Sequence, residues 1–243
     1  MRLDRMTWPE VDAYLARSTG IIIGSGSMEQ HGPIGLIGTD AICADSIATE
    51  AAERADAIAA PALFYTPAPF NTSFPGTVSV SAGLYEELTV EIFNALAAQG
   101  FRSIYLLNGH GANLEPLEKV TTRIEGARIR VRSWWSFPTV QALRDEWYGE
   151  WEGMHATPSE VAVTQHVTGI IHKGAETPPR KLTADYIRDH AGDRHGPPDE
   201  HRASFPDGRV GSHSALAAPE HGRQLFEAAA DAVAEDYRAF LHS

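Results

Sequence analysis

The sequence predicts an α/β fold, a single three-layer α/β/α domain over residues 1–243 with a mostly parallel central sheet. Short apolar segments alternate along the chain with longer amphipathic or alanine-rich segments. That alternation is typical of parallel strands covered by helices on both faces. Hydrophobic residues make up 43% of the chain, which is enough for a sizeable core. The sequence contains no internal repeat and no separate linker.

Four short segments are predicted to be buried strands. They are dominated by aliphatic residues and bounded by glycine, proline or small polar residues, as buried strands are. In the first of them, Ile21-Ile22-Ile23 runs into the small residues Gly24 to Ser27. The predicted strands cover residues 21–23, 57–63, 103–107 and 127–133.

Helix boundaries carry recognisable capping signals. Capping boxes begin at Thr7 and Thr157, and Ser81 can cap a third helix that ends at Gly100. Along that third helix a stripe of apolar side chains is predicted to face the core: Leu84, Leu88, Ile92 and Leu96. The predicted helices cover residues 7–17, 40–54, 84–99, 157–167 and 219–241.

Residues 174–215 are polar, with many glycine, proline and histidine residues and little periodicity. This pattern predicts a long functional loop or lid region. The histidines in it are irregularly spaced, so they predict no further metal site: His190, His195, His201 and His213.

Composition excludes several classes of function. The formal net charge of −12 disfavours binding to nucleic acid, because acidic surfaces repel phosphate backbones. The longest aliphatic run, Ile21 to Ile23, is far too short to cross a membrane. Cys43 is the one cysteine, so no internal disulfide is possible. With no apolar signal core near the start, we expect a cytoplasmic protein.

Two polar loops follow predicted strands and should open onto the same edge of the sheet. The first contains Glu29 and His31, with Asp40 nine residues after the histidine, and the second contains His110 between two glycines. Carboxylates and imidazoles together suit Zn²⁺ or Mn²⁺. The simpler alternative is a polar loop in which Asp40 caps a helix, Glu29 is solvated and His110 is incidental.

A third pair, His155 and Glu160, lies at the start of a predicted helix. Glu160 occupies the N3 position of the Thr157 capping box, which is a sufficient structural role, and His155 could be a surface residue. No Gly-x-Ser-x-Gly elbow and no phosphate-binding glycine loop with lysine is present. Serine hydrolases and P-loop proteins are therefore excluded.

Taken in order, these segments resemble the creatininase (creatinine amidohydrolase) family. The similarity covers nearly the whole chain and includes weaker matches at 208–211 and 219–222. Its main blocks are Gly24 to Pro33, Gly38-Thr39-Asp40, Phe74-Pro75-Gly76-Thr77, Asn108 to Asn113, and His155-Ala156 followed by Glu160.

The resemblance implies two divalent ions, zinc and/or manganese, bridged by Asp40. It places Glu29 and His110 on one ion and His31 on the other. Creatininase carries a further glutamate ligand at the position of Ala112, so here Glu160 is expected to complete the second ion. Two ions about 3.5–4 Å apart can together activate a water and polarise a carbonyl.

The function that the resemblance implies is hydrolysis of a C–N bond in a small amide, cyclic amides included. His155 is expected to move a proton to the leaving nitrogen, with Trp151, Asn71 and Thr77 around the substrate. Many members have a histidine where Asn71 stands, which weakens creatinine itself as the substrate. The family usually forms homo-oligomers, often hexamers.

Other functions remain open at this stage. Within the family, the chain could instead deformylate a small molecule or trim a peptide in cofactor biosynthesis. From other classes, the alternatives are a non-catalytic metal-binding oligomer and a metal-dependent phosphoesterase.

Overall fold

The computed structural model describes all residues from 1 to 243 and contains one four-stranded sheet in the order β2-β1-β3-β4. Every neighbouring pair of strands is parallel, which confirms the predicted α/β class. The strands are β1 (Gly20–Ser25), β2 (Ile58–Leu63), β3 (Ser103–Asn108) and β4 (Arg128–Ser133).

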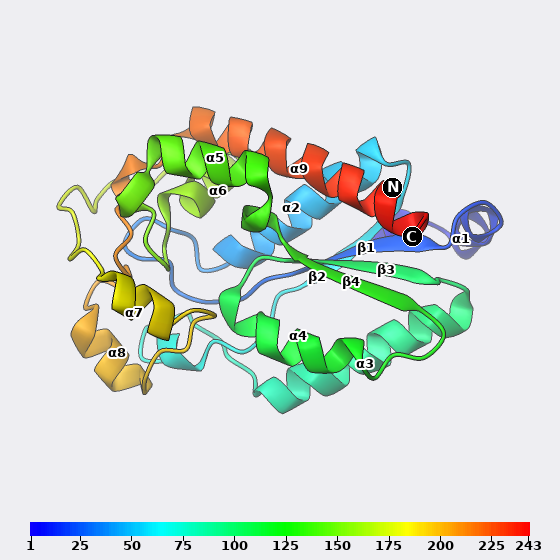
Figure 1. Ribbon diagram of the computed structural model, residues 1–243, viewed down its shortest axis with the longest axis horizontal. Helices are drawn as coiled ribbons and strands as arrows, with labels where there is room; N and C mark the ends of the chain where they lie inside the picture. Colours follow the sequence, from blue (N-terminus) through cyan, green and yellow to red (C-terminus); the bar gives the residue numbers. More distant parts are fainter.

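Helices cover both faces of this sheet (Figure 1). Helices α2 and α9 cross one face with α5 and α6 beside them, and α3 and α4 cover the other. The α-helices are α1 (Trp8–Leu15), α2 (Thr39–Arg54), α3 (Ala82–Gln99), α4 (Leu114–Thr121), α5 (Pro138–Trp147), α6 (Pro158–Thr168), α7 (Ala184–Asp189), α8 (Pro198–Ser204) and α9 (Pro219–Leu241). Short 3₁₀ helices cover Leu3–Arg5, Pro69–Asn71, Gly111–Asn113, Trp134–Ser136, Gly149–Trp151 and Ser214–Leu216.

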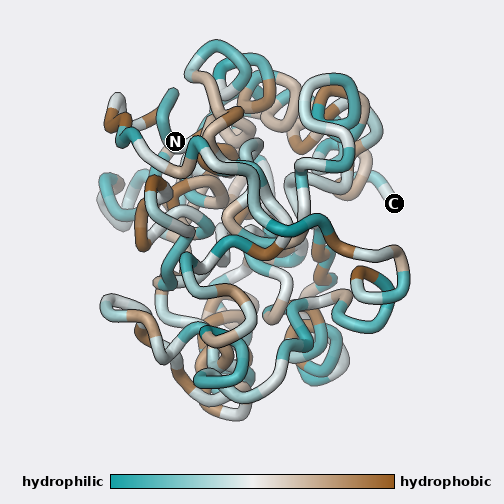
Figure 2. The backbone as a smooth tube through the Cα atoms, turned by 90° about the vertical axis from the view of Figure 1, so that its left-hand side faces the viewer, coloured by the Kyte–Doolittle hydropathy of each residue, from teal (hydrophilic) through white to brown (hydrophobic).

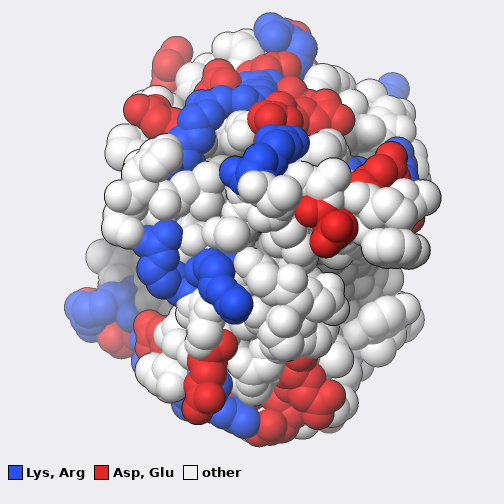
Figure 3. Space-filling view, turned by 90° about the vertical axis from the view of Figure 1, so that its right-hand side faces the viewer, with Lys and Arg blue, Asp and Glu red and all other residues white.

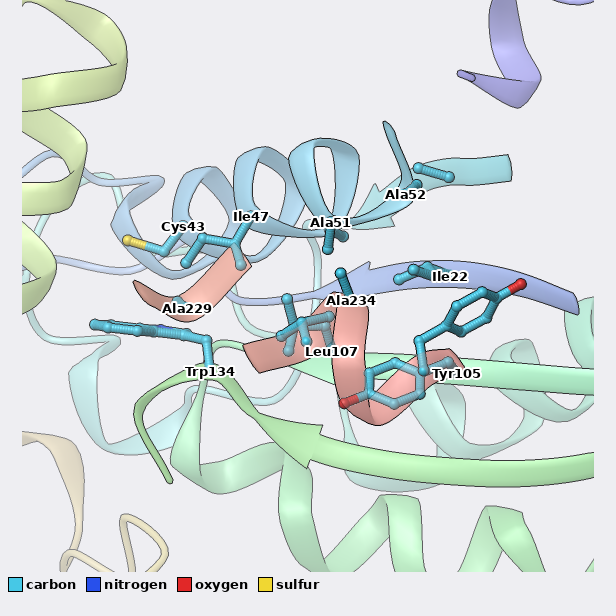
Figure 4. Packing of buried hydrophobic residues seen from close by; sticks show 14 of the residues in the cluster. Ile22, Cys43, Ile47, Ala51, Ala52, Tyr105, Leu107, Trp134, Ala229 and Ala234 are labelled. Carbon is cyan, nitrogen blue, oxygen red and sulfur yellow. The ribbon is translucent and has the colours of Figure 1, made fainter. Parts of the chain in front are cut away.

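The strands divide their side chains between two cores. On one face Ile22, Tyr105 and Leu107 pack against α2 and α9 (Figure 4). On the other, Ile21 and Ile104 pack among the residues of α3 and α4. Successive strand side chains point to opposite faces, so a strand that is apolar at every position fills both cores.

One predicted stripe is wrong in its first half. Leu84 and Leu88 are 57% and 44% exposed, whereas α3 turns Tyr85, Phe93 and other side chains inward. Tyr85 occupies the buried position instead, because its ring fills the core and its hydroxyl forms a hydrogen bond of 2.7 Å with the hydroxyl of Ser25. The second half is confirmed, since Leu96 is buried and Ile92 packs against the core.

Outside residues 174–215, the structure adds two α-helices that the sequence pattern did not predict, α4 and α5. Strand β4 is also less apolar than expected, since Arg128, Arg130 and Arg132 alternate with its apolar residues. Arg130 forms an ion pair with Asp236 of α9 at 3.0 Å, which accounts for a charged side chain beside a covered sheet face.

The lid region, residues 174–215, is more ordered than predicted. It contains α7 and α8, joined by residues 190–197, and both lie beyond the carboxyl ends of the strands (Figure 1). Thr183 caps α7 through its hydroxyl, and Pro198 begins α8, so local signals for short helices are present. Figure 2 views the chain from this side and shows hydrophobic stretches interspersed with hydrophilic ones.

The strand order creates a crevice at the functional edge. The chain passes from β1 to β2 on one side and then returns past β1 to β3, so the loops after β1 and β3 separate at this point. Open α/β sheets bind ligands at such a switch point. These two loops are the ones that carry Glu29, His31 and His110.

None of the helices is both long enough and apolar enough to cross a lipid bilayer. On the opposite side of the molecule from α7 and α8, lysine and arginine side chains lie beside aspartate and glutamate (Figure 3).

Candidate metal centre

The loop after β1 delivers Glu29 and His31 into the interior, where both side chains are inaccessible to solvent. Gln30 between them fixes the loop. Its side-chain amide donates to Asn71 Oδ1 at 2.8 Å and to the carbonyl of Gly208 at 3.0 Å, and its Oε1 accepts the amide of Gly32 at 2.7 Å. The loop is therefore held by segments far away in the sequence.

Asp40 lies in the first turn of α2, and His110 follows β3. Gly109 lets these two segments touch, because a Cβ there would lie 2.4 Å from the carbonyl oxygen of Asp40. The strand end and the helix start are thereby brought into contact, with the side chains of Asp40 and His110 facing each other.

Asp40 occupies the middle of the cluster. Its Oδ1 is 2.9 Å from His31 Nε2, and its Oδ2 is 3.1 Å from His110 Nδ1. Glu29 Oε1 is 3.2 Å from the same nitrogen of His110. Two compact ligand sets share Asp40: Glu29, Asp40 and His110, and His31, Asp40 and Glu160.

Each histidine in the centre has one ring nitrogen next to a backbone carbonyl. His31 Nδ1 is 3.1 Å from the carbonyl of Glu29, His110 Nε2 is 2.8 Å from that of Pro67, and His155 Nε2 is 2.7 Å from that of Gln30. These carbonyls assign a proton to those nitrogens, which leaves the other nitrogen of each ring as a lone-pair donor facing the carboxylates.

The donor set fits divalent cations. Glu29 Oε1 and Asp40 Oδ2 are buried and accept no hydrogen bond. Burying carboxylate oxygens without a partner costs free energy of folding unless a cation binds them. Without metal, protons on the histidines balance the charge of the carboxylates. Burial lowers the pKa of His31, but Asp40 and Glu160 outweigh it and raise this pKa to about 10. The pKa of His110 is likewise raised, against its burial, by Glu29 and Asp40.

Glu160 lies at the third position of α6 and has two kinds of contact. Its Oε1 accepts the backbone N–H of Thr157 at 2.5 Å, which closes the capping box, and the same oxygen is 3.7 Å from His31 Nε2. Burial and the nearby Asp40 raise its pKa to about 8, although His31 opposes this. The helix cap and the second ligand set therefore share this carboxylate.

His155 joins the centre from the segment before α6. Its free Nδ1 is 3.5 Å from Glu29 Oε1, and it forms a third compact set with Glu29 and His31. Burial lowers the pKa of His155 to about 3, so the ring is neutral. A neutral ring offers a lone pair at Nδ1, as a ligand or as a proton acceptor.

The three residues expected around the substrate are placed differently. Asn71 is fully buried and donates to Glu29 Oε2 at 3.0 Å. Thr77 accepts the backbone N–H of Gln30 at 3.0 Å. Trp151 packs against His213, with the ammonium of Lys181 over its ring. All three lie outside the lining of the pocket at the centre.

That pocket has a volume of about 230 Å³ and reaches Asp40, His110, His155 and Glu160. Trp134 and Trp135 line it, together with Arg144 of α5 and, from the lid, Gly192 and Asp193. Sequence reasoning missed Asp193, which lies among irregular polar residues where no spacing singles it out.

The sequence is similar to those of known proteins of one family. The family model "Creatininase: Creatinine amidohydrolase" matches residues 4–237. The mycofactocin precursor peptide peptidase of Mycolicibacterium smegmatis is 32% identical over 171 residues, covering 66% of this chain and 67% of that protein. Creatinine amidohydrolase of Pseudomonas putida is 27% identical over 177 residues, covering 65% and 68%.

Solved structures agree on the fold. A crystal structure of creatinine amidohydrolase superposes with a TM-score of 0.78 at 21% identity, covering 100% of this chain and 98% of the other. A structure titled "Creatininase Mn" gives 0.76 at 21% identity, covering 100% and 99%. The match of the family model over almost the whole length shows that this chain belongs to the creatininase family.

Proposed function

We propose that this chain is a divalent-metal-dependent amidohydrolase that cleaves a C–N bond in a small amide. Membership of the creatininase family makes hydrolysis of amide bonds the expected chemistry. The observation that carries the proposal is Asp40, whose two oxygens face His31 and His110 within two ligand sets that share it. A shared carboxylate is the natural bridge between two cations.

Two ions fit the donor atoms. Glu29, Asp40 and His110 would hold one, and His31, Asp40 and Glu160 the other. Mixed nitrogen and oxygen ligands suit Zn²⁺ and Mn²⁺. When bound, such ions supply an activated water and polarise the amide carbonyl.

The chain's own groups would then orient the ligands and move protons. Asn71 donates to Glu29 Oε2 and so directs Oε1 toward His110. His155 would take up a proton at Nδ1, because its Nε2 is engaged by Gln30, and would pass it to the leaving nitrogen. Because His155 also fits as a ligand, metal content separates its two roles: a His155→Ala protein with full metal and low kcat supports proton transfer.

A small amide fits the pocket, whose volume of about 230 Å³ is below the range typical of drug-sized ligands. Creatinine-like cyclic amides, formamides and the ends of short peptides are the substrate classes to test, since the relatives include a creatinine amidohydrolase and a peptide peptidase. Substrate contacts by Trp151, Asn71 and Thr77, which the family resemblance implies, stay part of the proposal.

The decisive experiment combines metal analysis with a hydrolysis screen on those three substrate classes. Two ions per chain and release of amine, ammonia or formate support the proposal. Phosphate release from generic esters, with no amide cleaved, would indicate a phosphoesterase. Bound metal without hydrolysis of either kind would indicate a non-catalytic metal-binding protein.

Two further properties are proposed. We expect a homo-oligomer, a hexamer by analogy with the family, and several large apolar side chains are exposed and available for subunit contacts, among them Trp8, Leu84 and Ile171. Light scattering on the purified protein tests this. We also expect a cytoplasmic location, because the single cysteine, Cys43, is buried and free.

A further inference from the structure

We propose that Asp193 is a specificity-determining residue, which binds a cationic or N–H-rich group next to the scissile amide. This inference rests on the proposed function, since it concerns the substrate of the same pocket. It predicts that the preferred substrates are amides bearing an amino or guanidino-type group, and that neutral amides of the same shape bind less well.

Asp193 reaches the pocket from the lid, between α7 and α8. Its side chain is 10% exposed, and its Oδ2 is 3.8 Å from His110 Nδ1, the nitrogen that faces the ligand sets. It lines the same pocket as His155 and Glu160. A carboxylate from a segment distant in sequence therefore faces the reaction space.

The carboxylate does not belong to any of the three compact ligand sets, whose atoms all lie within 4.8 Å of one another. The Asp193 carboxylate therefore lies close to the centre but is not one of the groups that would bind an ion. That position suits contact with a substrate bound over the centre.

The backbone around residue 193 and the glycine at position 111 allow the Asp193 side chain to point into the pocket. Asp193 adopts a left-handed conformation with φ of 55°, next to Gly192 at 74°, which is an unfavourable conformation for a residue with a side chain. Opposite it, Gly111 has no side chain, and a Cβ there would lie 2.1 Å from Asp193 Oδ2. The absence of a side chain at position 111 admits the carboxylate.

The other carboxylate oxygen faces the lid. Asp193 Oδ1 is 3.7 Å from His195 Nε2, whose side chain is 1% exposed. The His195 ring packs on Phe70, with ring centroids 4.8 Å apart, and its Nδ1 is 3.3 Å from the hydroxyl of Tyr186. This buried packing holds His195 in place and thereby fixes one side of Asp193.

The charges around the pocket favour a cationic group. Arg144 is the one lysine or arginine in its lining, and Glu152 binds that guanidinium at 2.9 Å. An anionic group on the substrate would therefore find no unpaired lysine or arginine side chain in the lining. An ammonium or guanidinium would meet Asp193, where low solvent exposure strengthens a charge-assisted hydrogen bond.

The test compares glycine hydroxamate with propionohydroxamate, which differ by an ammonium in place of a methyl group. Both carry a metal-binding hydroxamate and neither is an amide substrate that releases product. Their dissociation constants are measured by calorimetry on the metal-loaded protein, so the readout is independent of turnover. The variants are Asp193→Asn, and Asp189→Asn as an exposed control on the same lid.

Asp193 should favour glycine hydroxamate over propionohydroxamate by about tenfold in the unmodified protein, because one charge-assisted hydrogen bond contributes that much. In Asp193→Asn the ratio of the two constants should shrink about tenfold with metal content unchanged, and Asp189→Asn should keep the ratio of the unmodified protein. Gly111→Ala, which displaces the carboxylate without removing its charge, should also reduce the difference.

The same ratio of the two dissociation constants in the unmodified protein and in Asp193→Asn would overturn the role of Asp193 and leave the proposed function intact. Failure of both hydroxamates to bind, in a protein that also takes up no metal, would overturn the proposed function itself.

Discussion

The sheet edge and the lid contribute side chains to the same pocket but hold them by different means. Glu29, Asp40 and His110 come from the ends of β1 and β3 and the start of α2, and their side chains are at most 3% exposed. Glu160 and Asp193 come from α6 and the lid and are 13% and 10% exposed. The sheet edge is preorganised by buried hydrogen bonds, whereas the other side depends on a helix cap and a strained turn.

This difference gives each half its own expected role. The sheet-edge half fits a permanent cation site, since its geometry is fixed by Asn71, Gln30 and the backbone of Pro67. The outer half completes the second set and contacts what enters the pocket. Mutations in the two halves should therefore fail in different ways.

The largest effect is expected for His110→Ala. It removes the nitrogen shared by Glu29 and Asp40 in the sheet-edge set, so metal at that site and activity should be lost together. We expect kcat/KM to fall by about a thousandfold or more. Metal analysis of the dialysed protein alongside steady-state kinetics checks this, and a His110→Ala protein with full metal content would contradict the assignment.

Substitutions at Glu160 distinguish its role as a helix cap from its role as a metal ligand. Glu160→Ala should lose second-site metal and also about 1 kcal/mol of stability, because the N–H of Thr157 loses its partner. Glu160→Gln can still accept that N–H, so its metal-free form should keep normal stability while the intact protein loses metal affinity. Denaturant unfolding with chelator, combined with metal titration, measures both. Equal metal affinity in Glu160→Gln and the unmodified protein would restrict Glu160 to capping.

A smaller effect is expected for Asn71→Ala, which removes the donor to Glu29 Oε2. Loss of such a supporting hydrogen bond typically lowers metal affinity by about 10–100-fold. Thr72→Ala, at the exposed neighbouring position, serves as the control. If both variants bind metal as the unmodified protein does, the sheet-edge half does not depend on Asn71.

The smallest effect concerns the metal-free protein and pH. The pKa of His31 is raised to about 10, so its stabilising charge is fully present below about 6.5 and is lost as pH rises toward 10. Glu160, with a pKa raised to about 8, is stable as the neutral acid and also becomes unfavourable as pH rises from about 4.5 to 8.

Both groups thus destabilise the metal-free protein on the alkaline side. Its melting temperature should fall by about 5 °C between pH 6 and pH 9, relative to the metal-loaded protein. Scanning calorimetry with chelator and with added Zn²⁺ gives the two curves. Parallel curves across this range would show that cations do not replace protons at these groups.

Sequence patterns predicted the sheet, its strands and most of the long helices because buried strands and capping boxes leave local signals. Strand ends also predicted that Glu29, His31 and His110 would meet at one edge. The first half of α3 was mispredicted, since Leu84 and Leu88 continue a regular stripe, and the burial of Tyr85 instead depends on tertiary packing with Ser25.

The lid side was beyond local reasoning. Asp193 reaches the pocket through a left-handed turn and the absence of a side chain at Gly111, two features that are 82 residues apart in sequence and become related only in the fold. Arg144 also lines the pocket only because of the tertiary fold, and it lies on α5, a helix that the sequence pattern did not predict.

The most direct test of the account is anomalous diffraction from crystals of the metal-loaded protein. We predict two peaks on either side of Asp40, one beside Glu29 and His110 and the other beside His31 and Glu160. A single peak that does not touch Asp40, or none at all in a protein that hydrolyses amides, would contradict the account.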